Sequence, residues 1–300
     1  MKTKVLTLAI GIAALASFSA SAQTVSGRKD FSGFAGINVS DYFTVTVKQA
    51  EEYSAEWLVE SALKDYVQIS SKGSEIIATV DRKSFDKTTK KLYAGKKAES
   101  ATLRLTIYAP TLSSIAVSGD VKIDLSNIDI QSNGFTIDAT DNAVVTGLAV
   151  NASSATVTAS KKAEVKDAVI DASNMSINTL NQATVTVDQI SKSLSIQTNG
   201  TSVANVSGNS EGIEVISQNS AKLNIKGTAM SMDINTSGRE IHAEELKVGD
   251  VSVVSSNGCK TYICPEDNLS LDIKGGSLVS FSGKPVIDII NIQNSSVNHL

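Results

Sequence analysis

The fold is decided by a stretch that reads IDATDNAVV at residues 137–145, VTASKKAEV at 157–165, INTLNQATV at 177–185 and IQTNGTSVA at 196–204. Each segment opens with an aliphatic residue and carries a small or short polar residue two positions later. After a short polar stretch, the alternation of apolar and polar residues begins again. Alternate residues of a β-strand point to the same face. The aliphatic and small residues therefore share one face, and the unit recurs about every twenty residues.

The aliphatic and the small positions each recur from unit to unit, and we call each recurring set a column. Both columns can be followed from this stretch toward the N-terminus and toward the C-terminus. The aliphatic column comprises Val117, Ile137, Val157, Ile177, Ile196, Val215, Ile234, Val253 and Ile273, and the small column comprises Gly119, Ala139, Ala159, Thr179, Thr198, Ser217, Thr236, Ser255 and Gly275. Four residues after most aliphatic positions stands a residue such as Asp141, Asn181 or Gly200, which tolerates the left-handed backbone of a tight turn. Lys161 is the exception. The chain is expected to bend at these corners and then to start a second strand with inward-facing residues. His242 is expected among these inward-facing residues, in the column of Val185 and Leu223.

A unit of this length cannot bury its apolar face alone, so it must stack on copies of itself. Leucine-rich repeats share the period, but they carry a leucine and asparagine pattern and usually a helix. The sequence therefore predicts an all-β fold, a single-stranded right-handed parallel β-helix of the pectin-lyase-like type with an irregular, aromatic-rich N-terminal cap. The right hand follows from the general preference for right-handed crossovers between parallel strands.

The chain divides into a leader and one domain. Residues 1–22 combine Lys2 and Lys4, an apolar run and a Ser-Ala-Ser-Ala segment, which predicts a secretory signal peptide and hence a place in the periplasm, on the outer surface or outside the cell. Residues 23–300 are predicted to form a single β-helix domain. Its irregular N-terminal part covers about 28–110, its regular turns about 111–285, and a last strand or cap 286–300.

The charge and hydropathy of the chain indicate which classes of partner to expect. The formal net charge is −4, from 27 basic and 31 acidic residues, and nucleic-acid binding depends chiefly on clustered Lys and Arg, so nucleic acid is not expected as a partner. The one basic cluster is expected to be a solvated insertion loop, because acidic residues are interspersed in it; it comprises Lys83, Lys87, Lys90, Lys91, Lys96 and Lys97. After the leader no segment is apolar for the roughly 20 residues that a membrane-spanning helix needs, so an integral membrane protein is not expected.

Four acidic residues are the candidates for catalysis on a polysaccharide, namely Asp120, Asp124, Asp138 and Asp141. Such chemistry needs carboxylates gathered at fixed offsets, either to hold calcium or to act as an acid and base pair. On the following turns the counterparts of Asp138 are Thr158 and Asn178, so no acidic stack builds up. The sequence predicts no catalytic, cofactor-binding or metal-binding residues, no cofactor, and a protein that is not an enzyme.

Cys259 and Cys264 leave two alternatives open. Export permits oxidation, and a turn between the two residues would bring their Cα atoms within the roughly 7 Å that a disulfide requires. Cys259 also falls among the alanines that follow each corner, where a buried free thiol packs as a small hydrophobe.

Several segments resemble the head GIN domain family of putative autotransporter adhesins, which is common in Bacteroidetes-type bacteria. They are Phe31-Ser-Gly-Phe-Ala-Gly-Ile-Asn-Val39, Phe43-Thr-Val-Thr-Val47, Leu63-Lys-Asp65, Leu103-Arg-Leu-Thr-Ile-Tyr-Ala-Pro110, Leu112-Ser-Ser-Ile115 and Val117-Ser-Gly-Asp120. The resemblance extends from about Arg28 to the C-terminus. It implies a pectin-lyase-like architecture, no recognised catalytic constellation and a role in adhesion.

The sequence thus favours a secreted, non-enzymatic β-solenoid that acts in cell adhesion or as an envelope-associated scaffold. A surface glycan or a protein is the expected ligand. The alternative from another class is a polysaccharide lyase or hydrolase that acts on acidic glycans, and association of copies into a homo-oligomer is a third hypothesis.

Overall fold

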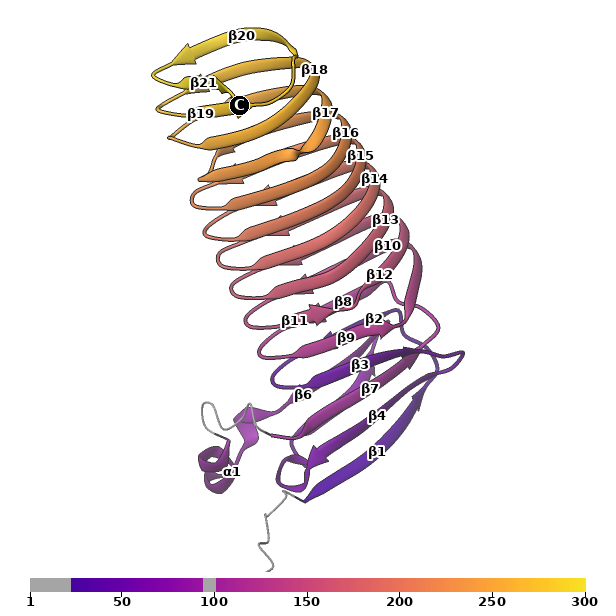
Figure 1. Cartoon of the computed structure of the whole chain (residues 1–300). Coiled ribbons are helices and arrows are strands. Elements are labelled where there is room, and N and C mark those ends of the chain that lie inside the picture. The colour runs from indigo at the N-terminus through magenta and orange to yellow at the C-terminus, as the bar shows by residue number, and fades with distance from the viewer. Residues whose placement is uncertain (1–22, 94–100) are drawn as a thin grey trace, which may run out of the picture.

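Successive turns of the chain lie on one another as a β-solenoid of about ten turns (Figure 1). The structure is a computed structural model that describes residues 23–93 and 101–300. The predicted signal peptide at 1–22 lies outside the described residues, as do Lys96 and Lys97 of the basic cluster. Within the described part, no helix has the length and apolar character needed to cross a membrane.

The regular part of the solenoid consists of strands, most of them long, that pair in parallel with the strand of the next turn. These strands are β10 (Asp129–Ala139), β11 (Val144–Thr146), β12 (Ala149–Ala159), β13 (Glu164–Thr179), β14 (Thr184–Thr198), β15 (Val203–Gln218), β16 (Lys222–Ser237), β17 (Glu240–Ser255) and β18 (Lys260–Lys274). Parallel neighbours lie about 4.8 Å apart, which sets the rise of each turn. The predicted parallel solenoid is confirmed.

Each turn has three inward-facing runs separated by breaks in the alternation of buried and exposed residues. In the turn that contains β13, buried side chains occupy 163–165, 168–172 and 175–179, while 166–167, 173–174 and 180–182 are exposed. The sharp corner at 180–182 has Asn181 at φ 62°, as the turn column predicted. The middle run was not foreseen, because its residues change from Ile170 in one turn to Gln189 in the next.

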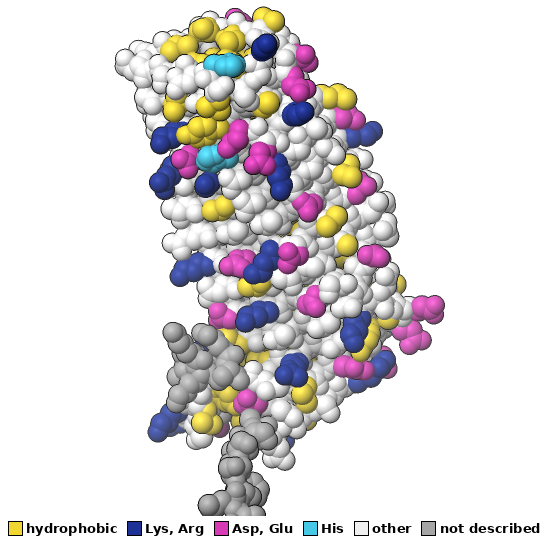
Figure 2. All heavy atoms as spheres, viewed as in Figure 1, with side chains coloured by type: hydrophobic (Ala, Val, Ile, Leu, Met, Phe, Trp, Pro, Cys, Tyr) yellow, Lys and Arg dark blue, Asp and Glu magenta, His cyan; other side chains and the backbone are white. Residues whose placement is uncertain are grey.

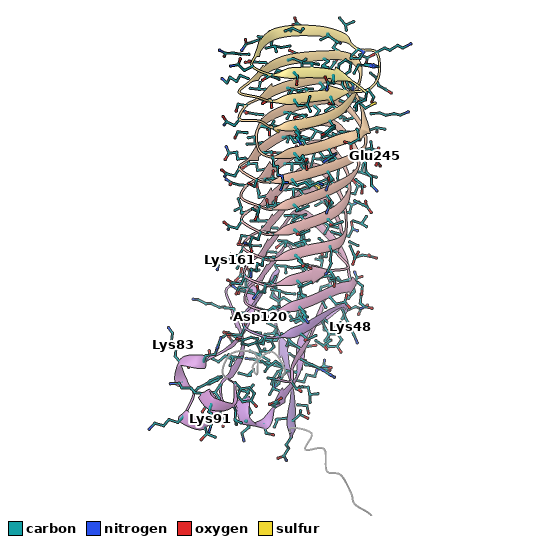
Figure 3. The ribbon with its side chains drawn as sticks, turned by 60° about the vertical axis from the view of Figure 1, so that its left-hand side comes forward. Lys48, Lys83, Lys91, Asp120, Lys161 and Glu245 are labelled. Carbon is teal, nitrogen blue, oxygen red and sulfur yellow. The ribbon has the colours of Figure 1, made fainter. Side chains whose placement is uncertain are left out.

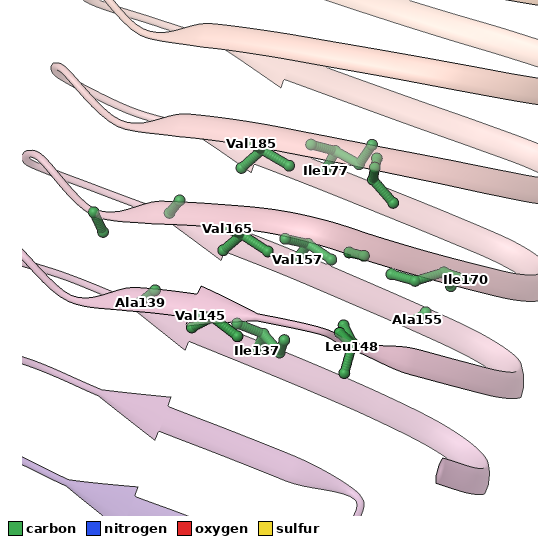
Figure 4. Close-up of a cluster of buried hydrophobic side chains, with 14 of the residues drawn as sticks. Ile137, Ala139, Val145, Leu148, Ala155, Val157, Val165, Ile170, Ile177 and Val185 are labelled. Carbon is green, nitrogen blue, oxygen red and sulfur yellow. The ribbon is translucent and has the colours of Figure 1, made fainter. Parts of the chain in front are cut away.

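The aliphatic column is correct in the middle of the chain and wrong at its two ends. From Ile137 to Val253 its members face one another in successive layers and are buried, and Figure 4 shows three of these layers with their aliphatic side chains stacked inside. Val117, however, faces Ala139, and Ile273 faces Ser255. The true members are two residues earlier, at Ile115 and Leu271.

Gly119 and Gly275 explain these end errors. Both were assigned to the small column on a strand, yet they have φ values of 78° and 70° and form the corners of their turns. Each lies four residues after the true aliphatic position, which is the spacing of the other corners.

The N-terminal part stacks its layers in an order that differs from chain order. Its strands are β1 (Thr24–Phe31), β2 (Gly36–Val39), β3 (Thr44–Gln49), β4 (Tyr53–Glu60), β5 (Val67–Lys72), β6 (Glu75–Val80), β7 (Leu103–Ala109), β8 (Ser114–Val117) and β9 (Lys122–Asn127). The pair β2 and β3 lies between β6 and β7 on one side and β8 and β9 on the other. Strand β4 pairs antiparallel with β7 and with β1, and β5 with β6. These antiparallel strands form the predicted irregular cap.

Aromatic side chains and short helices complete this cap. Phe34 packs edge-on against Phe31 and Tyr53, and Phe85 against Tyr66. Two short 3₁₀ segments, Ser61–Leu63 and Arg82–Ser84, precede the helix α1 (Lys87–Leu92). The expected insertion loop therefore contains a helix, whose first turn is held by Asp86 because its carboxylate accepts a hydrogen bond from the Thr89 N–H at 2.7 Å. Lys83 and Lys91 extend from this projection (Figure 3).

The last layer consists of β19 (Leu278–Phe281), β20 (Val286–Gln293) and β21 (Ser296–His299). Strand β20 continues the face of β18, and β21 lies on β19. Both ends of the stack are therefore formed by edge strands, with β1 at one end and β20 and β21 at the other (Figure 1).

Candidate functional site

A groove of about 470 Å³ lies on the outer face of β14 to β17. Polar side chains of modest length, among them Thr186, Asn205 and Asn224, form its floor, and the buried Val206 and Ile225 lie beneath them. Its walls carry charged side chains, which are Asp188, Lys222, Lys226, Glu244 and Glu245. In Figure 2 acidic and basic side chains gather around a histidine on this part of the solenoid.

One outward column runs through the groove from turn to turn. The register aligns Thr186, Asn205, Asn224, His242 and Tyr262 in successive layers. The Asn224 amide donates to the Asn205 side-chain oxygen at 2.6 Å, and the Asn205 amide donates to the Thr186 hydroxyl at 3.2 Å. Since each amide has two N–H donors and an oxygen with two lone pairs, this ladder keeps hydrogen-bonding capacity for a ligand.

His242 and Tyr262 form an aromatic pair at one end of this column. Their rings are stacked, with centroids 4.9 Å apart and planes 12° from parallel. The His242 Nδ1 lies 3.0 Å from a Glu244 carboxylate oxygen, and its Nε2 lies 3.7 Å from one of Glu240. The Glu244 carboxylate thus orients the imidazole through one hydrogen bond, and the stacked pair presents an aromatic surface beside polar groups.

The expected inward position of His242 is wrong. Ile241 faces Leu223 and is buried, whereas His242 faces Asn224 on the outside. Only 18 residues separate Leu223 from Ile241 along the chain, fewer than in the preceding turns. Because side chains alternate between faces, a register error of one residue moves a side chain to the opposite face.

A β-bulge in β17 shapes the charged wall. Between Asn224 and Lys226 of β16, β17 has one extra residue, so that Glu244 and Glu245 are both exposed. Bulges commonly redirect side chains next to functional sites. Glu245 lies opposite Lys226 in the register, so the wall alternates in charge and the groove has no strong excess of either sign.

This arrangement suits a neutral or weakly charged ligand that is rich in hydroxyl groups. Donors and acceptors alternate at the spacing of the turns, about 4.8 Å, and the ring of His242 offers an apolar surface at one end. A set of convergent polar groups beside a small apolar surface is the usual composition of a ligand site.

The four acidic candidates are not brought together in this groove. Asp138 faces outward on another face, and Asp120 accepts a hydrogen bond from the Asn142 amide at 2.7 Å. Asp141 lies at a corner with φ 66°, where the Lys161 ammonium donates to it at 2.5 Å and lowers the pKa of its carboxyl. Figure 3 shows Asp120 and Lys161 along a different edge of the solenoid from Glu245. Across residues 23–93 and 101–300, no three His, Cys, Asp or Glu side chains are grouped to hold a metal ion.

The two cysteines are free thiols in the structure. Cys259 is buried, with its sulfur 3.2 Å from the Thr236 hydroxyl, and Cys264 is partly exposed. The turn that a disulfide would need is absent, because β18 runs continuously from Lys260 past Cys264. Five residues of extended strand separate the Cα atoms by about 16 Å, well beyond the limit for a disulfide.

Comparison with known proteins agrees with this architecture. A family model described as "Putative auto-transporter adhesin, head GIN domain" matches residues 33–183 and 170–285. A putative adhesin from Parabacteroides distasonis ATCC 8503, whose crystal structure is known, is 15% identical, and the match covers 93% of this chain and 98% of that chain with a TM-score of 0.55. A putative adhesin from Parabacteroides merdae ATCC 43184 is 16% identical, and the match covers 93% of this chain and 97% of that chain with a TM-score of 0.49. No curated protein matches the chain.

Proposed function

The chain belongs to the family of the putative auto-transporter adhesin head GIN domain, and from that premise we propose that it is an exported, non-enzymatic binding protein whose groove holds a glycan. The proposal includes removal of residues 1–22 and a location outside the cytoplasm, with the remainder acting as one β-helix domain. The observation that carries it is the outward column from Thr186 to His242, which lines the groove, with Tyr262 stacked on His242 in the next layer. Hydrogen-bonding groups and one aromatic ring converge there on one groove, as a hydroxyl-rich ligand requires.

A non-enzymatic role is supported by the placement of the acidic residues. Hydrolysis of a glycosidic bond needs two carboxyl groups on either side of the bond, with one kept protonated. Asp141 instead has a lowered pKa and is engaged by Lys161, which is unsuited to a general acid. The description of the family as a putative adhesin points in the same direction.

The test is a glycan-array screen of the purified protein, followed by calorimetric titration of the best ligand. His242→Ala and Asn224→Ala should each weaken binding by about tenfold or more, since lost hydrogen bonds and stacking typically cost about 1–2 kcal/mol. Asn235→Ala, on the outer face of the same strand β16 but away from the groove, is the matched control and should bind as the wild type does.

Two results would contradict the proposal. The first is an absence of binding to any glycan, and the second is binding that both groove variants leave unchanged. Turnover of uronate-rich glycans in the presence of calcium, abolished by Asp138→Asn and Asp141→Asn, would support the polysaccharide-acting enzyme instead.

A further inference from the structure

The C-terminal layer exposes side chains that are buried in every preceding layer. Ile287, Ile289 and Ile292 continue the inward column of Leu269, Leu271 and Ile273. The three residues below are fully buried, whereas those of β20 are 44%, 58% and 38% exposed. Figure 2 shows hydrophobic side chains gathered at this end of the molecule. Among the described residues, the strand that pairs with β20 is β18.

The edge of β20 lacks the usual protection against pairing. Native edge strands are generally shielded by charged side chains or by covering segments. Asp288 is the single charged side chain of β20, and the extra residue at its bulge is Ile290, which is 67% exposed.

The other end of the solenoid is protected in this way. The edge strand β1 carries Arg28, Lys29 and Asp30 in succession. Arg28 forms ion pairs with Asp30 at 3.1 Å and with Glu56 at 2.9 Å. Stacking of the C-terminal end on this N-terminal end would bury these charges beneath isoleucines, and the desolvation of charged groups is costly even when they are paired. A head-to-tail fibre is therefore disfavoured.

We propose that two copies of this chain dock through their C-terminal ends, with the two β20 strands pairing antiparallel about a two-fold axis between Ile289 and Ile290. A two-fold interface uses the same patch on both subunits, and β20 is complementary to itself in this register. Ile287 lies opposite Ile292 of the partner subunit on the inward face. Asp288 lies opposite Asn291 of the partner subunit on the outward face, so that no like charges meet.

Asn291 is placed to complete this contact. One N–H of its side-chain amide donates to Asp272 of the layer below at 3.2 Å, and the second N–H remains for a carboxylate in the layer above. The same Asn-to-Asp contact between turns recurs inside the solenoid, where Asn268 donates to Asp250 at 2.6 Å. Docking therefore continues the apolar interior, the backbone ladder and an existing side-chain ladder into the second copy.

The test measures the oligomeric state of the protein by sedimentation velocity and by light scattering over a wide range of concentrations. The wild type should approach twice the mass of one chain as concentration rises. Ile289→Lys should raise the dimer dissociation constant by more than about tenfold, because an ammonium would be buried at the centre of the interface. The matched control is Ile190→Lys, since Ile190 is also 58% exposed but lies on the side of the solenoid; this variant should dimerise as the wild type does.

A second variant tests the register. Asn291→Asp would place its carboxylate opposite Asp288 of the partner subunit, so dimerisation should weaken at low salt and recover as salt screens the repulsion. Unchanged circular dichroism spectra establish that both variants fold. The proposal is overturned if the wild type stays monomeric at every concentration, if oligomers grow beyond the dimer, or if Ile289→Lys dimerises as well as Ile190→Lys.

Discussion

At the scale of single residues, two stacked glycines allow the middle run of the turns to close. Gly208 and Gly227 have φ values of 129° and 124° and face each other in adjacent layers. A Cβ on Gly208 would lie 1.7 Å from the carbonyl oxygen of Gln189, and one on Gly227 would lie 1.8 Å from that of Gly208. The backbones approach so closely here that no side chain fits between them.

Gly208→Ala should therefore lower the free energy of unfolding by about 2–4 kcal/mol, through backbone strain and the displacement of the layer below. Urea denaturation followed by circular dichroism measures the change. Gly212→Ala in the same strand is the control, because its Cβ would meet only the Ser231 hydroxyl at 3.6 Å; its effect should stay below about 0.5–1 kcal/mol. Equal effects of the two substitutions would refute the steric explanation.

A second prediction at this scale concerns the corner residue Asp141. Its ion pair with Lys161 lowers the pKa of its carboxyl below the ordinary 3.8. A carboxyl with a lowered folded pKa stabilises the fold above its unfolded pKa, and this contribution is lost as pH falls through the folded pKa. Asp141→Asn, which suits the left-handed backbone equally well, should cost less than about 1 kcal/mol at neutral pH, because the pair is exposed.

The same variant should lose less stability than the wild type when the pH falls from about 5 to about 3. Urea midpoints over a pH series provide the measurement, with Asp138→Asn on the strand face as the control. A wild type and an Asp141→Asn variant whose stabilities decline in parallel would contradict the assigned role of the ion pair.

At the scale of elements, the positions of bends decide which side chains meet. Strand β18 continues straight through Cys264, so the two cysteines are held apart, whereas a bulge in β17 places Glu244 and Glu245 together on the groove wall. A bulge adds one residue to one strand only. Toward β16 the register resumes at Glu245, whereas toward β18 it shifts after Ala243 and again after Val248.

The straight course of β18 predicts two free thiols in each chain. Titration with a thiol reagent in denaturant, without reductant, should detect both. In the native protein Cys264 should react first, because Cys259 is fully buried. Cys264→Ser should remove the rapid phase. Detection of no thiol in the denatured, unreduced protein would mean that a disulfide forms and that β18 is distorted.

At the scale of the whole molecule, stability should be distributed along the stack. In a solenoid each turn contacts only its neighbours, so the terminal turns are supported from one side. The N-terminal end gains support from its antiparallel strands and aromatic cluster, while β20 and β21 rest only on the layer below.

Hydrogen exchange should reflect this asymmetry. Amides of β14 to β16 should be the most protected and those of β20 and β21 the least, because local opening requires least energy where the fewest contacts are broken. The measurement is best made by mass spectrometry on Ile289→Lys, which lacks the proposed pairing with a second copy. Uniform protection from β10 to β21 would show that the stack unfolds as one unit.

Much of the fold could be predicted from the chain because its signals are local. The alternation of side chains determines what faces inward, and the corner residues such as Asn181 and Asn219 determine where the chain bends. Seven members of the aliphatic column and the β-solenoid itself followed from these signals. The candidate site was not predicted, because His242 was expected on the inside and Asn205 and Asn224 carry no signal that distinguishes them from ordinary polar surface residues.

The sequence by itself thus determined that the chain winds into stacked parallel layers with an aliphatic interior, because side-chain alternation and turn preference act over a few residues. Only the tertiary structure decided the layer order β6, β2 and β8, the outward position of His242 and the exposure of Ile289. Each of these depends on the register between strands far apart in the chain. That register accumulates from every corner and bulge along the way, so a single residue more or less exchanges the inside of the solenoid for its surface.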